Sequence, residues 1–156
     1  MRIQTTEEMK RLLILALATI FYGCMGMFAQ YQVNCIDSNG ETMTFRVVGY
    51  GKNAKLASKD AELNVIKALM FEGVPNSQQH IPMVAATESE VKKGHGKALN
   101  DFFDAGYQSE ITRSVIVRKF GKDTNKQKSI TLDVTVNIRA LRSKLERIGI
   151  IRKFGL

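Results

Sequence analysis

The residues best suited to ligand chemistry lie just before a predicted helix, at Gly49, Gly51 and Lys52. Glycines at the start of a helix suggest a phosphate-binding loop, whose backbone N–H groups hold the anion. A Walker loop needs four residues between its glycines and then Lys-Ser or Lys-Thr, and a dinucleotide loop needs a third glycine. Neither pattern is met. The glycines therefore predict a tight strand-to-helix turn, and Lys52 is kept as a candidate anion contact.

Other groups that could act as ligands or acids are isolated in the sequence. His80 and His95 are the two histidines, and neither has a cysteine or carboxylate at metal-ligand spacing. Asp101 and Asp104 share one face of a short predicted helix, but nothing around them supports a glycosidase pair. No Gly-x-Ser-x-Gly nucleophile elbow is present. We therefore expect no catalytic residue, no metal and no cofactor, although an unrecognised enzyme working at the loop 75–96 remains an alternative.

The start of the chain has the form of a secretory signal peptide. Lys10 and Arg11 precede an apolar run from Leu12 to Tyr22, and small residues follow. The run is too short to span a bilayer, which takes about 20 apolar residues. We expect residues 1–29 to be the signal peptide, with a cut after Gly26 as a second option. The protein is then exported to the periplasm or to the outer membrane.

A lipid anchor is the alternative to plain cleavage. The segment Phe21-Tyr22-Gly23-Cys24 resembles the lipobox of bacterial lipoproteins, in which the cysteine is lipidated and becomes the first mature residue. Gly23 fits that pattern, and the two aromatic residues depart from it. Membrane association is expected only with this lipidation at Cys24. Cys35 is then the one remaining cysteine, so no intramolecular disulfide forms, and we interpret it as a small buried hydrophobe.

The rest of the chain predicts one basic domain, residues 30–156, of ordinary size. Residues 30–112 carry eight Lys or Arg and ten Asp or Glu, whereas residues 113–156 carry twelve and three. Such a basic half attracts anionic polymers or lipid headgroups, and nucleic acid is excluded as a partner for an exported protein. The candidate anion- or partner-binding residues are Lys52, Arg118, Lys119, Lys122, Lys126, Arg139 and Arg142.

Hydrophobic periodicity predicts the order of elements. Residues 42–50 alternate as a half-buried strand, and Asn39-Gly40 indicates a hairpin to a short partner strand at 32–36. A helix follows Asn53 and ends at Gly73. The other expected elements are a loop at 75–86, a helix opening at 87 but interrupted at 94–96, a short helix at 97–105, strands at 110–120 and 129–140, and a last helix at 141–148.

The side-chain pattern predicts how these elements pack. The long helix has one row rich in alanine, Ala54, Ala57, Ala61, Val65 and Ala68, and a second row of Leu56, Leu63, Ile66 and Met70. We expect Ile111, Val115 and Val117 to share the buried face of their strand. The last strand carries a polar row on its other face, a solvated surface or a docking surface, made of Thr131, Asp133, Thr135, Asn137 and Arg139.

The predicted fold class is α+β. It is a two-layer domain in which an antiparallel sheet is packed on one face by the Ala-rich helix, with a short C-terminal helix. The sequence Val48-Gly49-Tyr50-Gly51, the Ala-rich helix and the polar-faced hairpin strand resemble the LPP20-type lipoproteins and the N-terminal domain of flagellar assembly protein T. The resemblance covers residues 45–73 and 111–145, and implies an envelope domain without known catalysis.

Together these observations predict a non-enzymatic cell-envelope domain with a structural or protein-interaction role. The expected partner is an envelope protein or an anionic envelope component. The alternative is a binder of anionic envelope polymer or lipid headgroups that uses the basic C-terminal half. The sequence does not define an oligomeric state.

Overall fold

The computed structural model describes residues 32–152. Backbone contacts group the chain into two units, Met1–Gln30 and Tyr31–Leu156, and the described residues belong to the second. The predicted signal peptide, residues 1–29, and the candidate lipidation site Cys24 lie outside the described residues, as do the ends of the predicted domain 30–156. The signal peptide, the lipidation site and the bounds of the domain therefore stay predictions.

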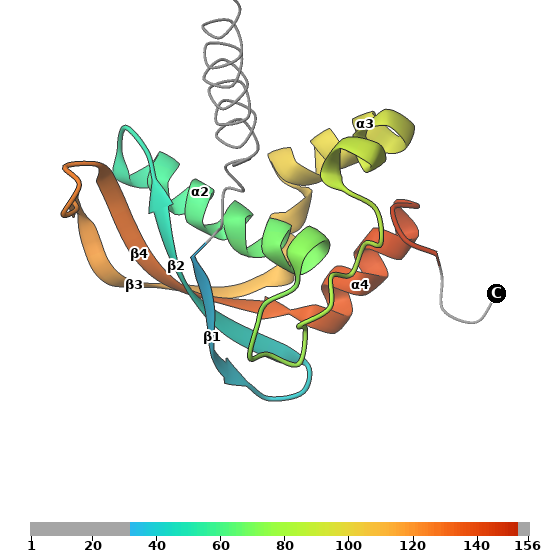
Figure 1. The fold of residues 1–156 in the computed structure, drawn as a ribbon, viewed down its shortest axis with the longest axis horizontal. Helices are drawn as coiled ribbons and strands as arrows, with labels where there is room; N and C mark the ends of the chain where they lie inside the picture. Colours follow the sequence, from blue (N-terminus) through green and yellow to red (C-terminus); the bar gives the residue numbers. More distant parts are fainter. Residues whose placement is uncertain (1–31, 153–156) are drawn as a thin grey trace, which may run out of the picture. The chain divides into compact units, whose positions relative to one another are not determined.

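The described residues form one four-stranded antiparallel sheet (Figure 1). Its strands are β1 Val33–Ser38, β2 Thr42–Tyr50, β3 Ile111–Lys122 and β4 Lys128–Asn137, in the order β1-β2-β4-β3. The predicted hairpin is confirmed: β1 pairs with β2 through a turn in which Gly40 has a φ of 87°. That left-handed conformation favours glycine, which explains why the turn falls at Asn39-Gly40.

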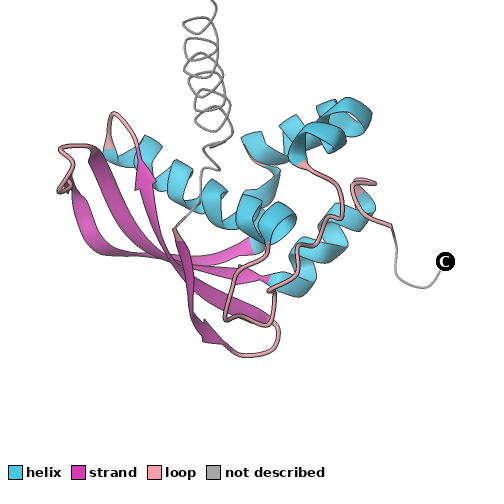
Figure 2. Ribbon diagram, in the orientation of Figure 1, coloured by secondary structure: helices cyan, strands magenta, loops and turns pink. Residues whose placement is uncertain are grey.

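The two faces of the central strands differ as the alternation predicts. Phe45 and Val47 of β2, with Leu132 and Val134 of β4, are buried against helices. The face bearing Thr44, Arg46, Asp133 and Thr135, called the open face below, carries no helix from the described part of the chain (Figure 2). The predicted α+β class, with an antiparallel sheet packed on one face by helices, is confirmed.

The Ala-rich helix is α2, Ala54–Lys67, and it continues as a π-helical turn, η1, Ala68–Glu72. Asn53 caps its start by accepting a hydrogen bond from the Leu56 N–H at 2.9 Å. Gly73 closes the helical segment with a φ of 74°. The alanine row is fully buried from Ala57 to Ala68, as expected. In the second row Leu56 differs, because its side chain is 49% exposed.

The segment 73–87 forms the predicted irregular loop, and backbone hydrogen bonds tie it to the helix before it. The N–H of Met83 donates to the Leu69 carbonyl at 3.1 Å, and that of Val84 donates to the Met70 carbonyl at 2.8 Å. Both side chains are buried. This part of the loop belongs to the core and does not form a free binding loop.

The next helix, α3, runs Glu88–Asp104 and begins with a capping box between Thr87 and Glu90. The predicted interruption is a kink within one helix: His95 has a non-helical φ of −134°. A short 3-10 turn, η2, Gly106–Glu110, then leads into β3. The predicted C-terminal helix is confirmed as α4, Ile138–Arg147, with Leu141 and Leu145 buried.

The predicted orientation of β3 holds at Ile111, which lies opposite Val136 and packs against the core, but it is wrong at Val115. Ile116 lies opposite Leu132, so Ile116 is on the helix-covered side of the sheet, whereas Val115 lies opposite Asp133 on the open face. Register shifts between Ile111 and Arg113, and between Ile116 and Arg118, change the alternation along the strand. Helix α2 packs on β2 and β4, and Val115 and Val117 of the expected dry face of β3 are exposed.

Candidate functional site: the β3 edge and the basic end

Strand β3 stands at one end of the sheet order and pairs with β4 on one side. In the described structure every residue from Thr112 to Lys119 is exposed. An edge strand presents unpaired N–H and C=O groups, and proteins usually protect such edges. We call the exposed stretch from Arg113 to Lys119 the β3 edge.

The centre of the β3 edge is apolar. Val115 is 38% exposed, Ile116 58% and Val117 46%, and these three residues are consecutive. Their side chains do not form one stripe, because Val115 faces the open side of the sheet and Ile116 the helix side. Apolar groups are therefore available on both sides of the same edge. Isolated exposed hydrophobic residues need no explanation, but three in succession on an edge strand favour an interaction surface.

A hollow of about 340 Å³ adjoins the start of this edge. The Ser114 hydroxyl donates to the Glu62 carboxylate at 2.7 Å, which ties β3 to α2. Next to this contact the ring of Tyr107 is fully buried. Burial raises the pKa of the Tyr107 phenol, and the negative charge of Glu62 raises it further. The hollow is lined by Glu62, Gln108, Ile111, Thr112, Arg113 and Ser114.

Cations gather where the β3 edge runs into the β3–β4 hairpin. The β2–α2 turn joins the same end of the sheet, because the Gly51 N–H donates to the Lys128 carbonyl at 3.2 Å. This contact brings Lys52 toward the hairpin. We call this region the basic end; its cations are Lys52, Arg118, Lys119, Lys122, Lys126 and Lys128.

Most of these charges are not neutralised by neighbouring side chains. Asp123, the acid of the hairpin loop, accepts hydrogen bonds at 2.8 Å from the backbone N–H groups of Asn125 and Gln127. Arg118 donates to the Lys122 carbonyl at 3.1 Å, which carries no formal charge. Within residues 32–152 the salt bridges are Arg46–Asp133, Lys67–Glu88 and Arg139–Glu41, and none includes a cation of the basic end.

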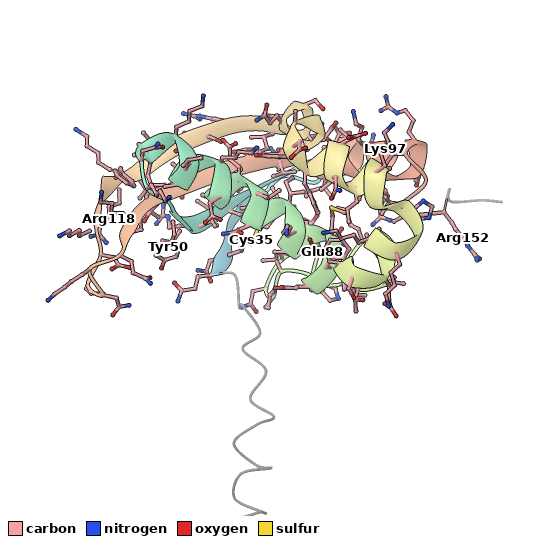
Figure 3. All side chains as sticks on the ribbon, turned by 90° about the horizontal axis from the view of Figure 1, so that it is seen from above. Cys35, Tyr50, Glu88, Lys97, Arg118 and Arg152 are labelled. Carbon is pink, nitrogen blue, oxygen red and sulfur yellow. The ribbon has the colours of Figure 1, made fainter. Side chains whose placement is uncertain are left out.

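The structure separates the predicted anion-binding residues into two groups. Lys52 and the hairpin cations lie at the basic end. Arg139 and Arg142 belong to α4, which Figure 1 shows at the opposite end of the sheet, and Figure 3 likewise places Arg118 and Arg152 at opposite ends. Arg139 forms an ion pair with Glu41 at 2.9 Å. The basic C-terminal half of the sequence therefore does not form one basic surface.

The predicted polar row of β4 lies on the open face. Two of its side chains, Asp133 and Thr135, are hydrogen-bonded to side chains of β2. Arg46 donates to both carboxylate oxygens of Asp133, each at 2.8 Å. These hydrogen bonds lower the pKa of Asp133 and raise the pKa of Arg46. The hydroxyls of Thr44 and Thr135 are hydrogen-bonded to each other at 3.0 Å. Asn137 ends β4 and caps α4 by accepting a hydrogen bond from the Ala140 N–H. Arg139 lies in α4, so its predicted place in the strand row is wrong.

The isolated groups considered for catalysis or metal binding stay apart. His80 lies in the loop after Gly73, and His95 is at the kink of α3. Residues 32–152 contain no group of three or more His, Cys, Asp or Glu arranged to hold a metal ion. Asp101 lines a mostly apolar hollow of about 430 Å³ between α3 and α4. Cys35 is half-buried rather than fully buried, and burial raises the pKa of its thiol.

No helix within the described range is long and apolar enough to cross a membrane. Comparison of the chain with protein-family models, curated proteins and solved structures returned no match. The resemblance to LPP20-type lipoproteins and to flagellar assembly protein T therefore stays a prediction from the quoted residues.

The β3 edge was missed by sequence reasoning, although a signal for it exists. Val115-Ile116-Val117 is an apolar run between Arg113 and Arg118 rather than an alternation. Such a run is typical of a strand that is covered on both faces. The described structure does not cover it.

Proposed function

We propose that this chain is an exported, non-enzymatic domain of a bacterial cell envelope that acts by binding another envelope protein. The form of residues 1–29 supports export to the periplasm or outer membrane. The observation that carries the interaction role is the β3 edge, with its apolar centre of Val115, Ile116 and Val117.

Physical reasoning supports this use of the edge. Exposing three apolar side chains on an edge strand invites aggregation, and natural edges are usually short or interrupted by charge. β3 has twelve residues. The cations at either side of the apolar centre discourage indiscriminate pairing, yet they leave the centre open. A protein partner that covers this strand removes the apolar surface from water and satisfies the edge groups.

A second candidate function is supported by the basic end. Lys119, Lys122 and Lys126 are exposed, and none of them forms an ion pair within residues 32–152. A cluster of this kind attracts an anionic envelope polymer or anionic lipid headgroups, and the attraction weakens as salt rises. We therefore propose anion binding for the basic end alone, and not for the whole basic C-terminal half.

Photo-crosslinking in living cells tests the proposal. A photoreactive amino acid placed at position 116 should form an adduct with another exported protein, identified by mass spectrometry. The matched control is position 56, because Leu56 is also apolar and about half exposed but lies on α2. Adducts of equal yield from both positions, or adducts only with cytoplasmic proteins, would contradict the proposed function.

A further inference from the structure

We infer that the β3 edge binds an extended segment of its partner as a fifth strand of the sheet, and that this segment carries acidic residues around an apolar centre. The inference rests on the proposed interaction role and names the chemistry of the partner. It follows from three features of the edge: its backbone, its apolar side chains and its charge.

The backbone of β3 offers the first requirement for strand addition. The strand is antiparallel to β4 and lies at the end of the order β1-β2-β4-β3. Exposure of every residue from Thr112 to Lys119 leaves room for an added strand of ordinary length. Added strands gain affinity from main-chain hydrogen bonds and specificity from alternate side chains. The other edge strand of the sheet, β1, is shorter, with six residues.

The side chains at the centre of the edge explain why the middle of the partner segment is apolar. Val115 and Ile116 project to opposite faces of the sheet. Successive side chains of an added strand also alternate between the faces. A segment with apolar residues at neighbouring positions would therefore contact Val115 on the open face and Ile116 on the helix side. A polar segment would leave both residues facing unfavourable neighbours.

The charges at the two ends of the edge explain why the partner segment is acidic. Arg113 precedes the apolar centre, and Arg118 and Lys119 follow it. Within residues 32–152 neither Arg113 nor Lys119 forms a salt bridge. Arg113 also lines the hollow of about 340 Å³, which leaves space for one end of the segment. Opposite charges on paired strands stabilise the pairing, and like charges oppose it.

The same charges argue against a second copy of this chain as the occupant. Antiparallel pairing of two β3 strands about Ile116 would put Arg113 opposite Lys119 at both ends. Parallel pairing in register would put each cation opposite its own copy. Both arrangements place like charges together. An acidic segment of a different protein satisfies the backbone, the apolar centre and the cations at once.

Peptide binding to the full chain, expressed with its own N-terminal segment and purified from the cells that produce it, tests this inference. The probe is a fluorescent peptide, Glu-Asp-Thr-Val-Val-Val-Thr-Asp-Glu, whose consecutive valines reach both faces of the sheet, followed by anisotropy. A second peptide has lysines in place of its acids. A third keeps the acids but is N-methylated at its five central residues, which removes the N–H donors on both edges. We expect the second and third peptides to bind at least about tenfold more weakly than the first.

Variants of the protein locate the binding. Ile116→Ser should weaken binding of the acidic peptide, and Arg113→Glu combined with Lys119→Glu should weaken it by about tenfold and favour the lysine peptide. The matched controls, Leu56→Ser and Lys92→Glu combined with Lys97→Glu, should bind the acidic peptide as the wild type does. These control residues are exposed on α2 and α3. Circular dichroism confirms that each variant is folded.

Three results would overturn the inference. Equal binding of the N-methylated peptide would show attraction by charge alone, without an added strand. Equal binding of the lysine peptide would remove the acidic requirement. Failure of the acidic peptide to bind, with self-association of the protein in sedimentation, would identify a second copy as the occupant. If the in-cell crosslink at position 116 still reaches an envelope protein, the proposed function stands and only this account of the partner fails.

Discussion

Ala61 of α2 packs directly against Gly49 of β2. A Cβ atom added to Gly49 would lie 2.7 Å from the Ala61 Cβ and 2.5 Å from the Ala61 backbone nitrogen, closer than van der Waals contact allows. The glycine and the alanine therefore let the helix lie close to the sheet. This helix packs on β2 and β4, and β3 is left as an exposed edge.

The first prediction follows from this contact. Gly49→Ala should destabilise the domain by about 1–3 kcal/mol, because the new methyl group meets the α2 backbone, which cannot move without shifting the helix. Gly94→Ala is the control, since a Cβ there meets nothing within 4 Å. In that helical position alanine should be neutral or stabilising by a few tenths to about 1 kcal/mol. Urea unfolding of both variants measures the difference, and equal stability would contradict the close packing.

The second prediction concerns the pH dependence of stability. Hydrogen bonds from Arg46 hold the pKa of Asp133 below its usual range in the folded protein. The stabilisation of the fold by ionised Asp133 is therefore fully present above the pKa of about 3.9 that the aspartate has in the unfolded chain. It is lost as pH falls through the lower pKa of Asp133 in the folded protein. Asp133→Asn should be less stable than wild type at pH about 7, and the deficit should shrink below pH about 3.

Urea unfolding at the two pH values measures this effect. The control is Asp101→Asn on α3, because that carboxylate forms no salt bridge within residues 32–152. The Asp101→Asn variant should have nearly the same free energy of unfolding as the wild type at both pH values. An Asp133→Asn deficit of the same size in acid as at neutral pH would mean that the lost stability does not come from the ionised carboxylate.

The third prediction concerns the basic end. Reversing Lys119, Lys122 and Lys126 to glutamate should weaken binding to vesicles containing phosphatidylglycerol at about 20 mM salt, and the difference should shrink at about 150 mM. The fold should be retained, because exposed charges contribute little to stability. Reversing Lys92, Lys93 and Lys97 on α3 makes the same change in net charge elsewhere. If both triple variants lose binding equally, net charge and not the basic end attracts the vesicles.

The fourth prediction concerns export. The mature protein should have its N-terminus between Cys24 and Gln30, with a lipid on Cys24 if the lipobox-like segment is used. Intact-mass and N-terminal peptide analysis of the protein from the producing cells measures this directly. A mature pool that retains Met1 or Met9 would show that the segment is not a cleaved signal.

Much of the fold was predictable because local signals agree with the tertiary packing. The Asn39-Gly40 turn, the Asn53 cap and the alternation of β2 each specify one backbone conformation, and the structure has all three. Leu56 shows the limit of such patterns. It fits an apolar helical row, but it lies in the first turn of α2, where the sheet does not reach it.

The site was harder to predict, because it depends on what is left uncovered. Periodicity placed Val115 with Ile111, and the register shift that separates them, between Ile111 and Arg113, carries no glycine or proline signal. The width of the helical layer, which decides whether Ile116 is covered, is a tertiary property. The sequence did identify the hairpin cations, but only the fold shows that Lys52 joins them and that Arg139 does not.

The most direct test of the central claim measures whether the β3 edge is covered in the cell. Ile116→Cys and Leu56→Cys, each in a Cys35→Ser background, are labelled with a membrane-impermeant maleimide in cells with a permeabilised outer membrane and again after purification. We predict that both cysteines react readily in the purified protein, whereas in cells position 116 is protected and position 56 still reacts. Equal labelling of the two positions in cells would contradict an envelope partner on the β3 edge.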